Sequence, residues 1–514
     1  MSDWTGGYIA NIGYTHGNYN ELNPQRIRLA FLRAGIAFPQ NATACELGYG
    51  QGLSINLHAA ASVTSWQGTD FNPAQAGHAQ QLAAASGAKV DLYDESFAEF
   101  CNRPNLPQFD FIGLHGIWSW ISDENRHVIV NFLRRKLKVG GVLYISYNTQ
   151  PGWAAMAPLR DLLAEHAELM GAPGSGILPR VDSALTFADK LLASGAQYGS
   201  ANPQVAARLE VLKGQDRSYL AHEYFNTHWL PMSFSKMRDW LDQAKLTYAC
   251  SANYIDHVDL LNLSAEQQKI LADIPDPGFR ETTRDFLVNQ QFRRDYWVRG
   301  ARPLSGPERM AQLRSQRFVL AVPREDVTLK ATGAMGEATL HDNVYQPVLA
   351  LMGDYRVHTL HEVETALAGL ADFNSVLQTL MILVGKGTIH PAQDDAVIDK
   401  ARPQCRRLNR ELCKLARYSG SVTALASPVT GGGIALGRFA QVFLLAAVDA
   451  PDQPVAWARY LLQVLGTQGQ QIIIDGKAPE SPEIEANEAM RLATEFKTKQ
   501  LPMLRALGVD CQHV

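Results

Sequence analysis

Glu46-Leu-Gly48-Tyr-Gly50-Gln-Gly52 is the stretch of sequence that decides the fold. It follows a short apolar run at 42–47, which indicates a strand, and precedes 53–62, which has helical spacing. Glycines at such a turn let the chain bend tightly and let a ligand approach the backbone. The unpaired N–H groups at the start of the following helix favour a carboxylate or a phosphate. The stretch therefore predicts a strand–turn–helix unit with a small-molecule site at the turn.

Strand and helix patterns alternate outward from this turn. Further strands are predicted at 63–69, 88–93, 110–114 and 142–147, and helices at 23–35, 72–85 and 125–138. Alternation of this length predicts parallel βαβ units, with helices on both faces of one sheet. Ligands of such sheets bind beyond the carboxyl ends of the strands. The first third of the chain is therefore predicted to be a doubly wound, Rossmann-like α/β domain.

Acidic residues lie near the predicted strand ends, where a nucleoside would meet them. Asp70 ends the second strand and can accept hydrogen bonds from both hydroxyls of a ribose. Asp94 ends the third strand and, with Ser96 and Phe97, can hold an adenine ring. The G-x-G-x-G spacing differs from the dinucleotide fingerprint, and a pyrophosphate disfavours an acid such as Glu46 beside the loop. These features argue against a nicotinamide-dependent oxidoreductase.

The glycine loop, the two strand-end aspartates and Leu137-Lys-Val-Gly-Gly141 together resemble the class I S-adenosylmethionine-dependent methyltransferases. The resemblance implies that the loop binds the methionine part of S-adenosyl-L-methionine, Asp70 the ribose and the third-strand segment the adenine. S-adenosyl-L-homocysteine would be the product, and no metal is implied. The cofactor-binding residues expected on this basis are Glu46, Gly48, Tyr49, Gly50, Asp70, Phe71, Asp94, Ser96, Phe97 and His115.

Leu114-His-Gly-Ile-Trp-Ser-Trp120 and Ser146-Tyr-Asn-Thr-Gln-Pro-Gly-Trp153 carry a narrower resemblance. Both resemble a bacterial group of methyltransferases with a regulatory domain, which includes lysine methyltransferases acting on outer-membrane proteins. Similar segments at 219–224, 284–296, 427–433 and 501–504 extend the resemblance over most of the chain. It implies three domains: a methyltransferase domain at 1–165, a mainly helical middle domain at 166–305 and a winged-helix-like α+β domain at 306–514. Gln150 stands where an aromatic residue is usual, and Gly17 where the lysine-methylating members have proline. The second difference puts the acceptor in doubt.

Methyl transfer from a sulfonium is an in-line displacement, so the protein must align donor and acceptor. A lysine acceptor must also lose a proton first, and aromatic faces can hold its alkylammonium group. Trp118 and Trp120 are either core residues or part of such a cage. The candidate catalytic residues near the strand ends are Tyr14, His16, His115, Tyr147 and Asn148, of which Tyr14 and His16 lie in a lead-in that would close as a lid. These residues alone single out no general base.

The remaining two-thirds of the chain has a mainly helical pattern. Helices are predicted over 158–212 with a loop at 171–176, over 227–244 and over 281–299, and again at 359–369 and 374–384 before a short strand or wing at 385–390. In the helix over 281–299, Asp285, Arg293, Arg294 and Asp295 are expected to form a solvated face. The segment 373–384 carries no Lys or Arg, which disfavours a nucleic-acid recognition helix.

The composition is typical of a globular protein. The chain has 514 residues, 46% hydrophobic and 19% charged, with a net charge of −4, which gives no overall polyanion-binding surface. The scattered cysteines, the first residues and the absence of a long apolar run predict a cytoplasmic protein without an export signal or membrane insertion. The expected partner is an acceptor protein, with no nucleic acid and with a homodimer left open. Two alternatives stay open: a methyltransferase for a small molecule or glycan, and a non-catalytic protein that senses the cofactor.

Overall fold

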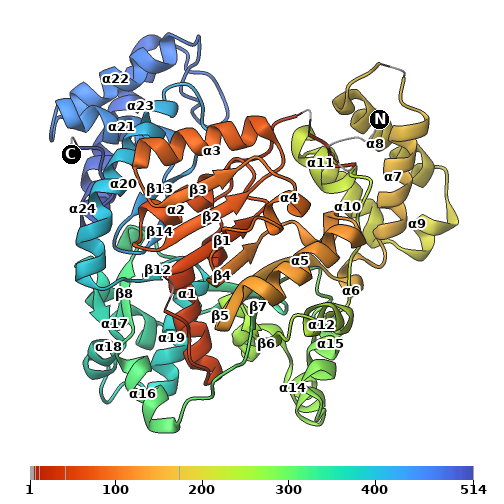
Figure 1. Cartoon of the computed structure of the whole chain (residues 1–514). Helices are drawn as coiled ribbons and strands as arrows, with labels where there is room; N and C mark the ends of the chain where they lie inside the picture. The colour runs from red at the N-terminus through yellow and green to blue at the C-terminus, as the bar shows by residue number, and fades with distance from the viewer. Residues whose placement is uncertain (1–4, 6, 11, 41, 173, 513–514) are drawn as a thin grey trace.

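A seven-stranded sheet lies at the centre of the computed structural model, which describes residues 5, 7–10, 12–40, 42–172 and 174–512 (Figure 1). The first residues, on which the absence of an export signal was argued, lie mostly outside this description. The strand order is β3-β2-β1-β4-β5-β7-β6, and β7 alone runs antiparallel to its neighbours. The strands are β1 (Thr43–Leu47), β2 (Ser65–Thr69), β3 (Val90–Tyr93), β4 (Phe109–Leu114), β5 (Leu137–Asn148), β6 (Thr247–Ser251) and β7 (Phe292–Val298). The predicted doubly wound α/β fold is confirmed, with β1 to β5 within a few residues of the predicted strands.

Helices cover both faces of this sheet. Side chains alternate across a strand, so Ala44 of β1 packs into one apolar cluster while Cys45 and Leu47 pack into another on the opposite face. The first cluster is closed by α1 (Pro24–Ala34), α2 (Leu53–Ala60) and α3 (Pro73–Ser86), and the second by α4 (Phe97–Cys101), α5 (Asp123–Lys136) and α12 (Phe234–Asp242). Burial on both faces explains why the parallel strands have near-continuous apolar sequences.

A helical insertion separates β5 from α12 and lies to one side of the sheet (Figure 1). Its helices are α6 (Gln150–Trp153), α7 (Ala157–Leu169), α8 (Ile177–Ala193), α9 (Gln197–Ala201), α10 (Gln204–Lys213) and α11 (Arg217–Tyr224). They enclose a core of their own, to which Leu163, Val181, Leu209 and Tyr224 belong. The predicted helices and the break near 171–176 are found here, whereas the helix predicted over 227–244 begins only at Phe234.

The last two strands of the sheet come from the region expected to be mainly helical. The prediction of one helix over 281–299 is wrong: α15 (Pro277–Leu287) ends, Asn289 turns with a φ of 48°, and β7 begins at Phe292. Between β6 and α15 lie η3 (Tyr254–His257), α13 (Asp259–Asn262) and α14 (Ala265–Ala272). The sheet therefore takes strands from both sides of the boundary predicted at residue 165, and the division into three domains stays a proposal.

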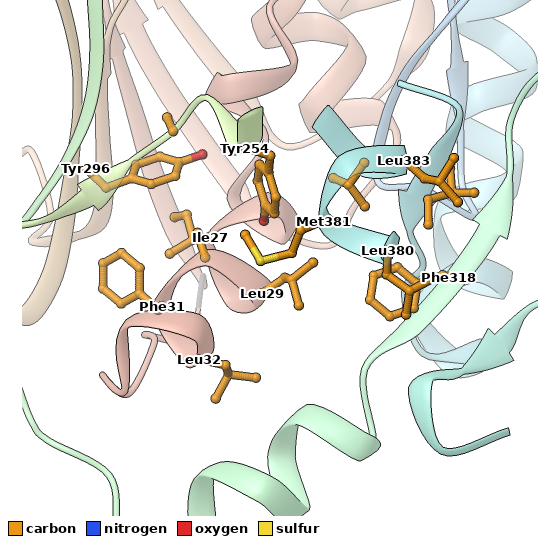
Figure 2. Packing of buried hydrophobic residues seen from close by; sticks show 14 of the residues in the cluster. Ile27, Leu29, Phe31, Leu32, Tyr254, Tyr296, Phe318, Leu380, Met381 and Leu383 are labelled. Atoms are coloured by element: carbon orange, nitrogen blue, oxygen red, sulfur yellow. The ribbon is translucent and has the colours of Figure 1, made fainter. Parts of the chain in front are cut away.

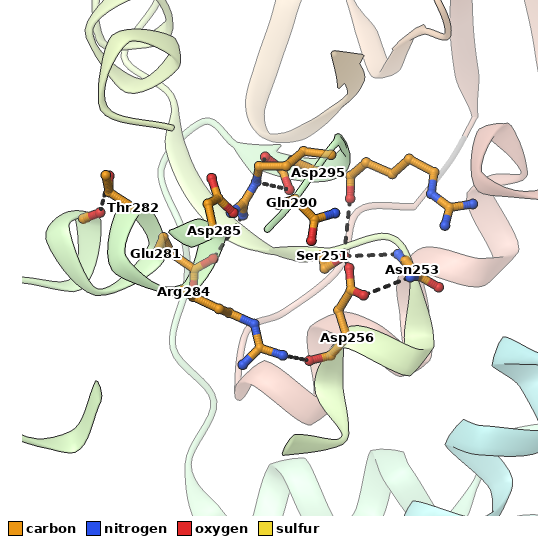
Figure 3. Close-up of polar contacts among 12 residues, drawn as sticks. Ser251, Asn253, Asp256, Glu281, Thr282, Arg284, Asp285, Gln290 and Asp295 are labelled. Atoms are coloured by element: carbon orange, nitrogen blue, oxygen red, sulfur yellow. Dashed lines mark hydrogen bonds and ion pairs between the residues drawn. The ribbon is translucent and has the colours of Figure 1, made fainter. Parts of the chain in front are cut away.

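Three of these charged residues, Asp285, Arg293 and Asp295, are buried, contrary to the solvated face expected for them, whereas Arg294 is partly exposed. Arg293 is 5% exposed, and its guanidinium contacts Asp285 at 2.7 Å, Glu281 at 2.8 Å and Asp295 at 2.9 Å. Figure 3 shows these three acidic residues close together. The expectation failed because a strand of period two places Arg293 and Asp295 on the same face, toward the protein, where a helix would spread them. This network joins α15 to β7, the strand next to the edge of the sheet.

The C-terminal region packs against the helices of the sheet. Its elements are α16 (Gly306–Arg314), β8 (Arg317–Leu320), η4 (Arg324–Asp326), β9 (Lys330–Gly333), β10 (Gly336–Thr339), α17 (Asp342–Met352), β11 (His358–Thr359), α18 (Leu360–Ala366), α19 (Phe373–Gly385), β12 (Ile389–Pro391), α20 (Asp395–Leu415), β13 (Ala424–Ser427), β14 (Gly432–Ala435), α21 (Arg438–Asp449), α22 (Pro454–Gly466), α23 (Pro482–Glu495), η5 (Phe496–Gln500) and α24 (Leu501–Ala506). Met381 of α19 lies with Tyr254 beside Ile27 and Leu29 of α1 (Figure 2). Two helices and a short strand thus stand near the predicted positions, beside the antiparallel sheet β11-β8-β12, and the winged-helix description stays a proposal.

None of the helices described in the structure combines the length and the apolar character that crossing a lipid bilayer requires.

Candidate active site

A cavity of about 290 Å³ lies where the carboxyl ends of β1 to β4 meet the glycine loop. Its walls include the loop itself, the residues that follow β2, β3 and β4, and tyrosines of the N-terminal lead-in. Ten of the predicted site residues line it: Tyr14, Glu46, Gly48, Tyr49, Gly50, Asp70, Phe71, Ser96, Phe97 and His115. The cavity therefore stands at the sheet edge where the strand–turn–helix argument placed a ligand.

The glycine loop is held against the end of β2 by backbone hydrogen bonds. Gly50 N donates to Asp70 Oδ2 at 2.9 Å, and Asn72 N donates to Asp70 Oδ1 at 3.0 Å, so the carboxylate is fixed. Gly48 has a φ of 76°, and a Cβ there would lie 2.3 Å from Ile117 Cδ1. Both the backbone conformation and the close approach therefore require glycine at position 48.

Two buried carboxyl groups give the cavity an affinity for a cation. Glu46 is 3% exposed, and no described residue hydrogen-bonds its Oε2. Burial, reinforced by the neighbouring Asp70, raises the pKa of Glu46 to about 8, and burial raises the pKa of Asp70 to about 6. An unpaired buried carboxyl oxygen needs a donor or a positive charge beside it. The ammonium group of a bound amino acid moiety fits this requirement.

The end of β3 contributes Glu95 to the cavity in place of the predicted Asp94. Asp94 is exposed and is not among the residues that line the cavity, whereas Glu95 lines it and pairs with Arg103. Ser96 caps α4 by accepting a hydrogen bond from Glu99 N, which presents Phe97 at the first position of the helix. An acid beside an aromatic ring suits a purine; Glu95 is the acid that lines the cavity, and the binding of adenine at this strand end stays a prediction.

Aromatic and histidine side chains form another part of the cavity lining. The His115 ring stacks on Tyr19 at 3.7 Å, and its Nδ1 lies 2.7 Å from the hydroxyl oxygen of Tyr144. Burial lowers the pKa of His115 to about 4, so its imidazole is neutral at physiological pH. Trp120 lines the cavity and donates from Nε1 to the backbone oxygen of Glu223 at 3.2 Å, whereas Trp118 is fully buried core.

Three predicted catalytic residues do not line this cavity. His16 packs edge-on against His78, with ring centroids 5.2 Å apart. Tyr147 is fully buried and donates to Asp295 Oδ2 at 2.9 Å, and the backbone N–H of Asn148 donates to Ser119 Oγ at 2.9 Å. Tyr147 points away because the alternation of β5 places it on the face opposite Tyr144 and Ser146.

Glu223 is a residue that sequence reasoning missed. It lies on α11 of the insertion, and the hydroxyl of Tyr14 is 3.5 Å from its Oε1. Burial raises the pKa of the Glu223 carboxyl to about 7. It belongs to the segment 219–224 that carries the resemblance, but its contact with Tyr14 joins positions separated by 209 residues, which no local pattern shows. Glu223 stands behind Tyr14 and does not itself line the cavity, whereas Tyr8 and Tyr19 line it and were missed for the same reason.

Comparisons with known proteins agree with this geometry. Residues 216–299 match the family model described as a predicted methyltransferase regulatory domain. The chain is 40% identical over 514 residues, 99% of its own length and 100% of the relative's, to the protein sll1526 of Synechocystis sp.. It is 26% identical over 290 residues, 55% of this chain and 51% of the relative, to the protein RP789 of Rickettsia prowazekii.

The structure of PKMT2 from Rickettsia typhi in complex with AdoHcy is similar to this chain, with a TM-score of 0.71 and 17% identity over 97% of this chain and 100% of that one. This likeness establishes the fold.

The class I fold, the site at the strand ends and the regulatory-domain match together define an S-adenosylmethionine-dependent methyltransferase. Within that class, the chain belongs to the family of the Synechocystis protein sll1526.

Proposed function

We propose that this protein methylates a lysine nitrogen of an acceptor protein, with S-adenosyl-L-methionine as the methyl donor. The observation that carries the proposal is a single cavity in which a glycine loop with buried acids faces a wall of aromatic rings. A loop with acids suits an amino acid nucleoside, and an aromatic wall suits an alkylammonium. The complex of Rickettsia typhi PKMT2 with AdoHcy, whose fold this chain shares, supports the choice of cofactor.

The residues of the cavity divide into a cofactor side and an acceptor side. Glu46 would accept hydrogen bonds from the ammonium group, and Asp70 would accept them from the ribose hydroxyls. Glu95 would hydrogen-bond the adenine, and Phe97 would pack against its ring. When bound, the cofactor supplies an electrophilic methyl group on a sulfonium. The acceptor side consists of Tyr14, Tyr19, His115 and Trp120.

Tyr14 and Glu223 form the pair best suited to remove the lysine proton. The ammonium proton would pass to the Tyr14 hydroxyl oxygen while the Tyr14 proton passes to the Glu223 carboxylate, which leaves the amine lone pair free. A pKa of about 7 for Glu223 suits a base that works near neutral pH. His115 is neutral and is held in place by Tyr144. It would therefore orient the acceptor and would not contribute a charge to the site.

Calorimetric titration with S-adenosylhomocysteine tests the cofactor side. We expect a Kd in the micromolar range, about −8 kcal/mol, weakened about tenfold or more in Asp70→Asn, since one carboxylate oxygen becomes a donor. Asp91→Asn is the matched control: this aspartate is exposed on β3, outside the cavity, and should bind as the wild type does. The absence of binding by the wild type would refute the proposal.

Transfer of a labelled methyl group into a cell lysate tests the acceptor side. We expect label in protein bands, with methyllysine found by mass spectrometry after digestion. Label confined to small molecules or glycans would overturn the lysine assignment and leave the methyltransferase class standing. Cofactor binding without transfer to any acceptor would indicate a sensor.

A further inference from the structure

A second cavity, of about 440 Å³, lies directly behind the aromatic wall of the first. Tyr19 and His115 line both cavities, and their rings are stacked 3.7 Å apart. The other walls of the second cavity come from η1 (Asn20–Leu22), α1, β7 and the end of α19 at 384–387. The stacked rings of Tyr19 and His115 therefore lie between residues 384–387 of the C-terminal region and the first cavity.

This cavity carries more positive than negative charge. Its charged lining residues are Arg26, Arg294 and Lys386 against one acid, Glu21, which pairs with Arg294 at 2.6 Å. Lys386 donates to the backbone oxygen of Thr328, a contact that leaves its charge unmatched.

Arg26 is the unusual member of this lining. It is 4% exposed, its guanidinium carbon lies 4.9 Å from the centroid of the Tyr254 ring, and no described residue accepts a hydrogen bond from its Nε. A buried guanidinium with an unused donor, facing a cavity, calls for an acceptor oxygen that the chain itself does not supply.

We propose that this second cavity binds the acceptor, and that it takes the carboxylate of an aspartate or glutamate close in sequence to the methylated lysine. The inference rests on the proposed function and names its substrate class: an acidic peptide segment. Arg26 and Lys386 bind the carboxylate, while the neighbouring lysine reaches the cofactor along the Tyr19 and His115 rings. The ammonium group of the lysine then lies beside the two aromatic rings, and the carboxylate lies beside the two cations. Both contacts are favourable.

An acidic peptide fits these observations better than a nucleic acid does. Binding of a polyanion relies on cations spaced along many phosphates. Here α19 contributes no cation before Lys386, which follows its last residue, and the cations line one cavity instead of a long surface. Selection of the acceptor by the C-terminal region follows, because Lys386 belongs to it.

Peptide binding to the full chain saturated with S-adenosylhomocysteine tests this inference. The probes are two fluorescein-labelled peptides that share one central lysine and differ only in having glutamate or glutamine around it. By fluorescence anisotropy we expect the glutamate peptide to bind about tenfold more tightly, the value of one charge-assisted contact. Lys386→Ala should remove most of this difference, and Lys386→Glu should reverse it.

Lys400→Glu is the matched control, since this lysine is exposed on α20 and lines neither cavity; it should keep the wild-type preference. Arg26→Met should abolish the preference for the glutamate peptide more completely than Lys386→Ala does. If Arg26→Met does not fold, the two variants Lys386→Ala and Lys386→Glu still test the inference. Equal binding of the two peptides, or binding of neither, overturns the inference. So does tight binding of a labelled oligouridylate that is lost in Lys386→Ala, which would assign the cavity to nucleic acid. Failure of the chain to bind S-adenosylhomocysteine refutes the proposed function instead and is measured separately.

Discussion

Glu46 couples cofactor binding to proton release at the scale of the single residue. Its pKa in the free protein is raised to about 8, first by burial and then by Asp70, so below pH 8 it is mainly protonated. A ligand ammonium favours the carboxylate form, and binding must then expel the proton. Raising the pH removes this cost until the carboxyl is already ionised.

We therefore expect the Kd for S-adenosylhomocysteine to fall as pH rises from 6 to 8, by up to about tenfold per pH unit, and then to level off. Calorimetry in buffers of different ionisation enthalpy should detect close to one proton released at pH 7. Glu46→Gln should bind more weakly and lose the slope. A flat profile in the wild type would show that Glu46 does not meet the ligand's charge.

We expect a second pH dependence, caused by Glu223, in kcat and not in the Kd of the cofactor. The proposed relay needs Glu223 ionised, and its pKa is raised to about 7, so kcat should rise as pH increases through 7. Glu223→Gln should lower kcat about 10²–10⁴-fold and abolish that step, with the Kd of S-adenosylhomocysteine little changed.

Tyr14→Phe should reproduce the effect of Glu223→Gln, because both break the same relay. Glu210→Gln, which alters an acid on α10 paired with Lys213, should leave the profile intact. A variant that loses rate but keeps the pH step would place Glu223 in a purely structural role.

The cofactor side was predictable from sequence because it depends on local spacing. Glu46, the glycines and Asp70 sit at fixed offsets from strand ends, and the cavity collects them. Asp94 is exposed and does not line the cavity, whereas the next residue, Glu95, does; the sequence locates the end of the strand but not which of two adjacent acids turns toward the cavity. Glu223, Tyr8 and Tyr19 depend on contacts between distant segments, which no local pattern encodes.

At the scale of elements, the segment from α15 to β7 shows why patterning misled. Its apolar and charged residues satisfy helical spacing up to Leu287, and only the alternation from Phe292 onward requires a strand. Pairing with β5 and β6 then decides the conformation, since β7 completes the sheet between them. Tertiary pairing overrides local propensity here.

Arg293 should be essential to the stability of this junction. Arg293→Met removes the cation shared by Glu281, Asp285 and Asp295 and leaves the buried carboxyls of Asp285 and Asp295 without their ion pair. We expect a loss of about 3–5 kcal/mol in the free energy of unfolding, measured by urea denaturation. Arg302→Met, which removes a pair whose arginine side chain is 63% exposed, should cost less than about 1 kcal/mol. Equal effects of the two substitutions would contradict this account.

At the scale of the whole molecule, the C-terminal region and the sheet share their cores. Leu53 and Leu57 of α2 belong to the same apolar cluster as Leu408 and Leu412 of α20. On the other side, Met381 of α19 packs in one cluster with Ile27 of α1 (Figure 2). Neither contact was predictable, because a sequence shows that a helix has an apolar face but not which partner covers it. Since each region buries the other's apolar surface, neither should remain folded when the other unfolds.

Scanning calorimetry with and without S-adenosylhomocysteine checks this coupling. We expect residues 301–514 to melt in the same transition as the sheet. The difference in tryptophan fluorescence between the wild type and Trp457→Phe follows the C-terminal region, since the chain has nine tryptophans and Trp457 is buried in the C-terminal cluster. At about 100 times its Kd, the ligand adds about 2.7 kcal/mol, which raises that common Tm by about 2 °C for a chain of this size. Asp70→Asn should reduce the shift for both probes together, because the shared cores couple the ligand site to Trp457. A separate C-terminal transition that ignores the ligand would instead make the region an independent module, and acceptor selection by Lys386 would then require docking of two separately stable parts.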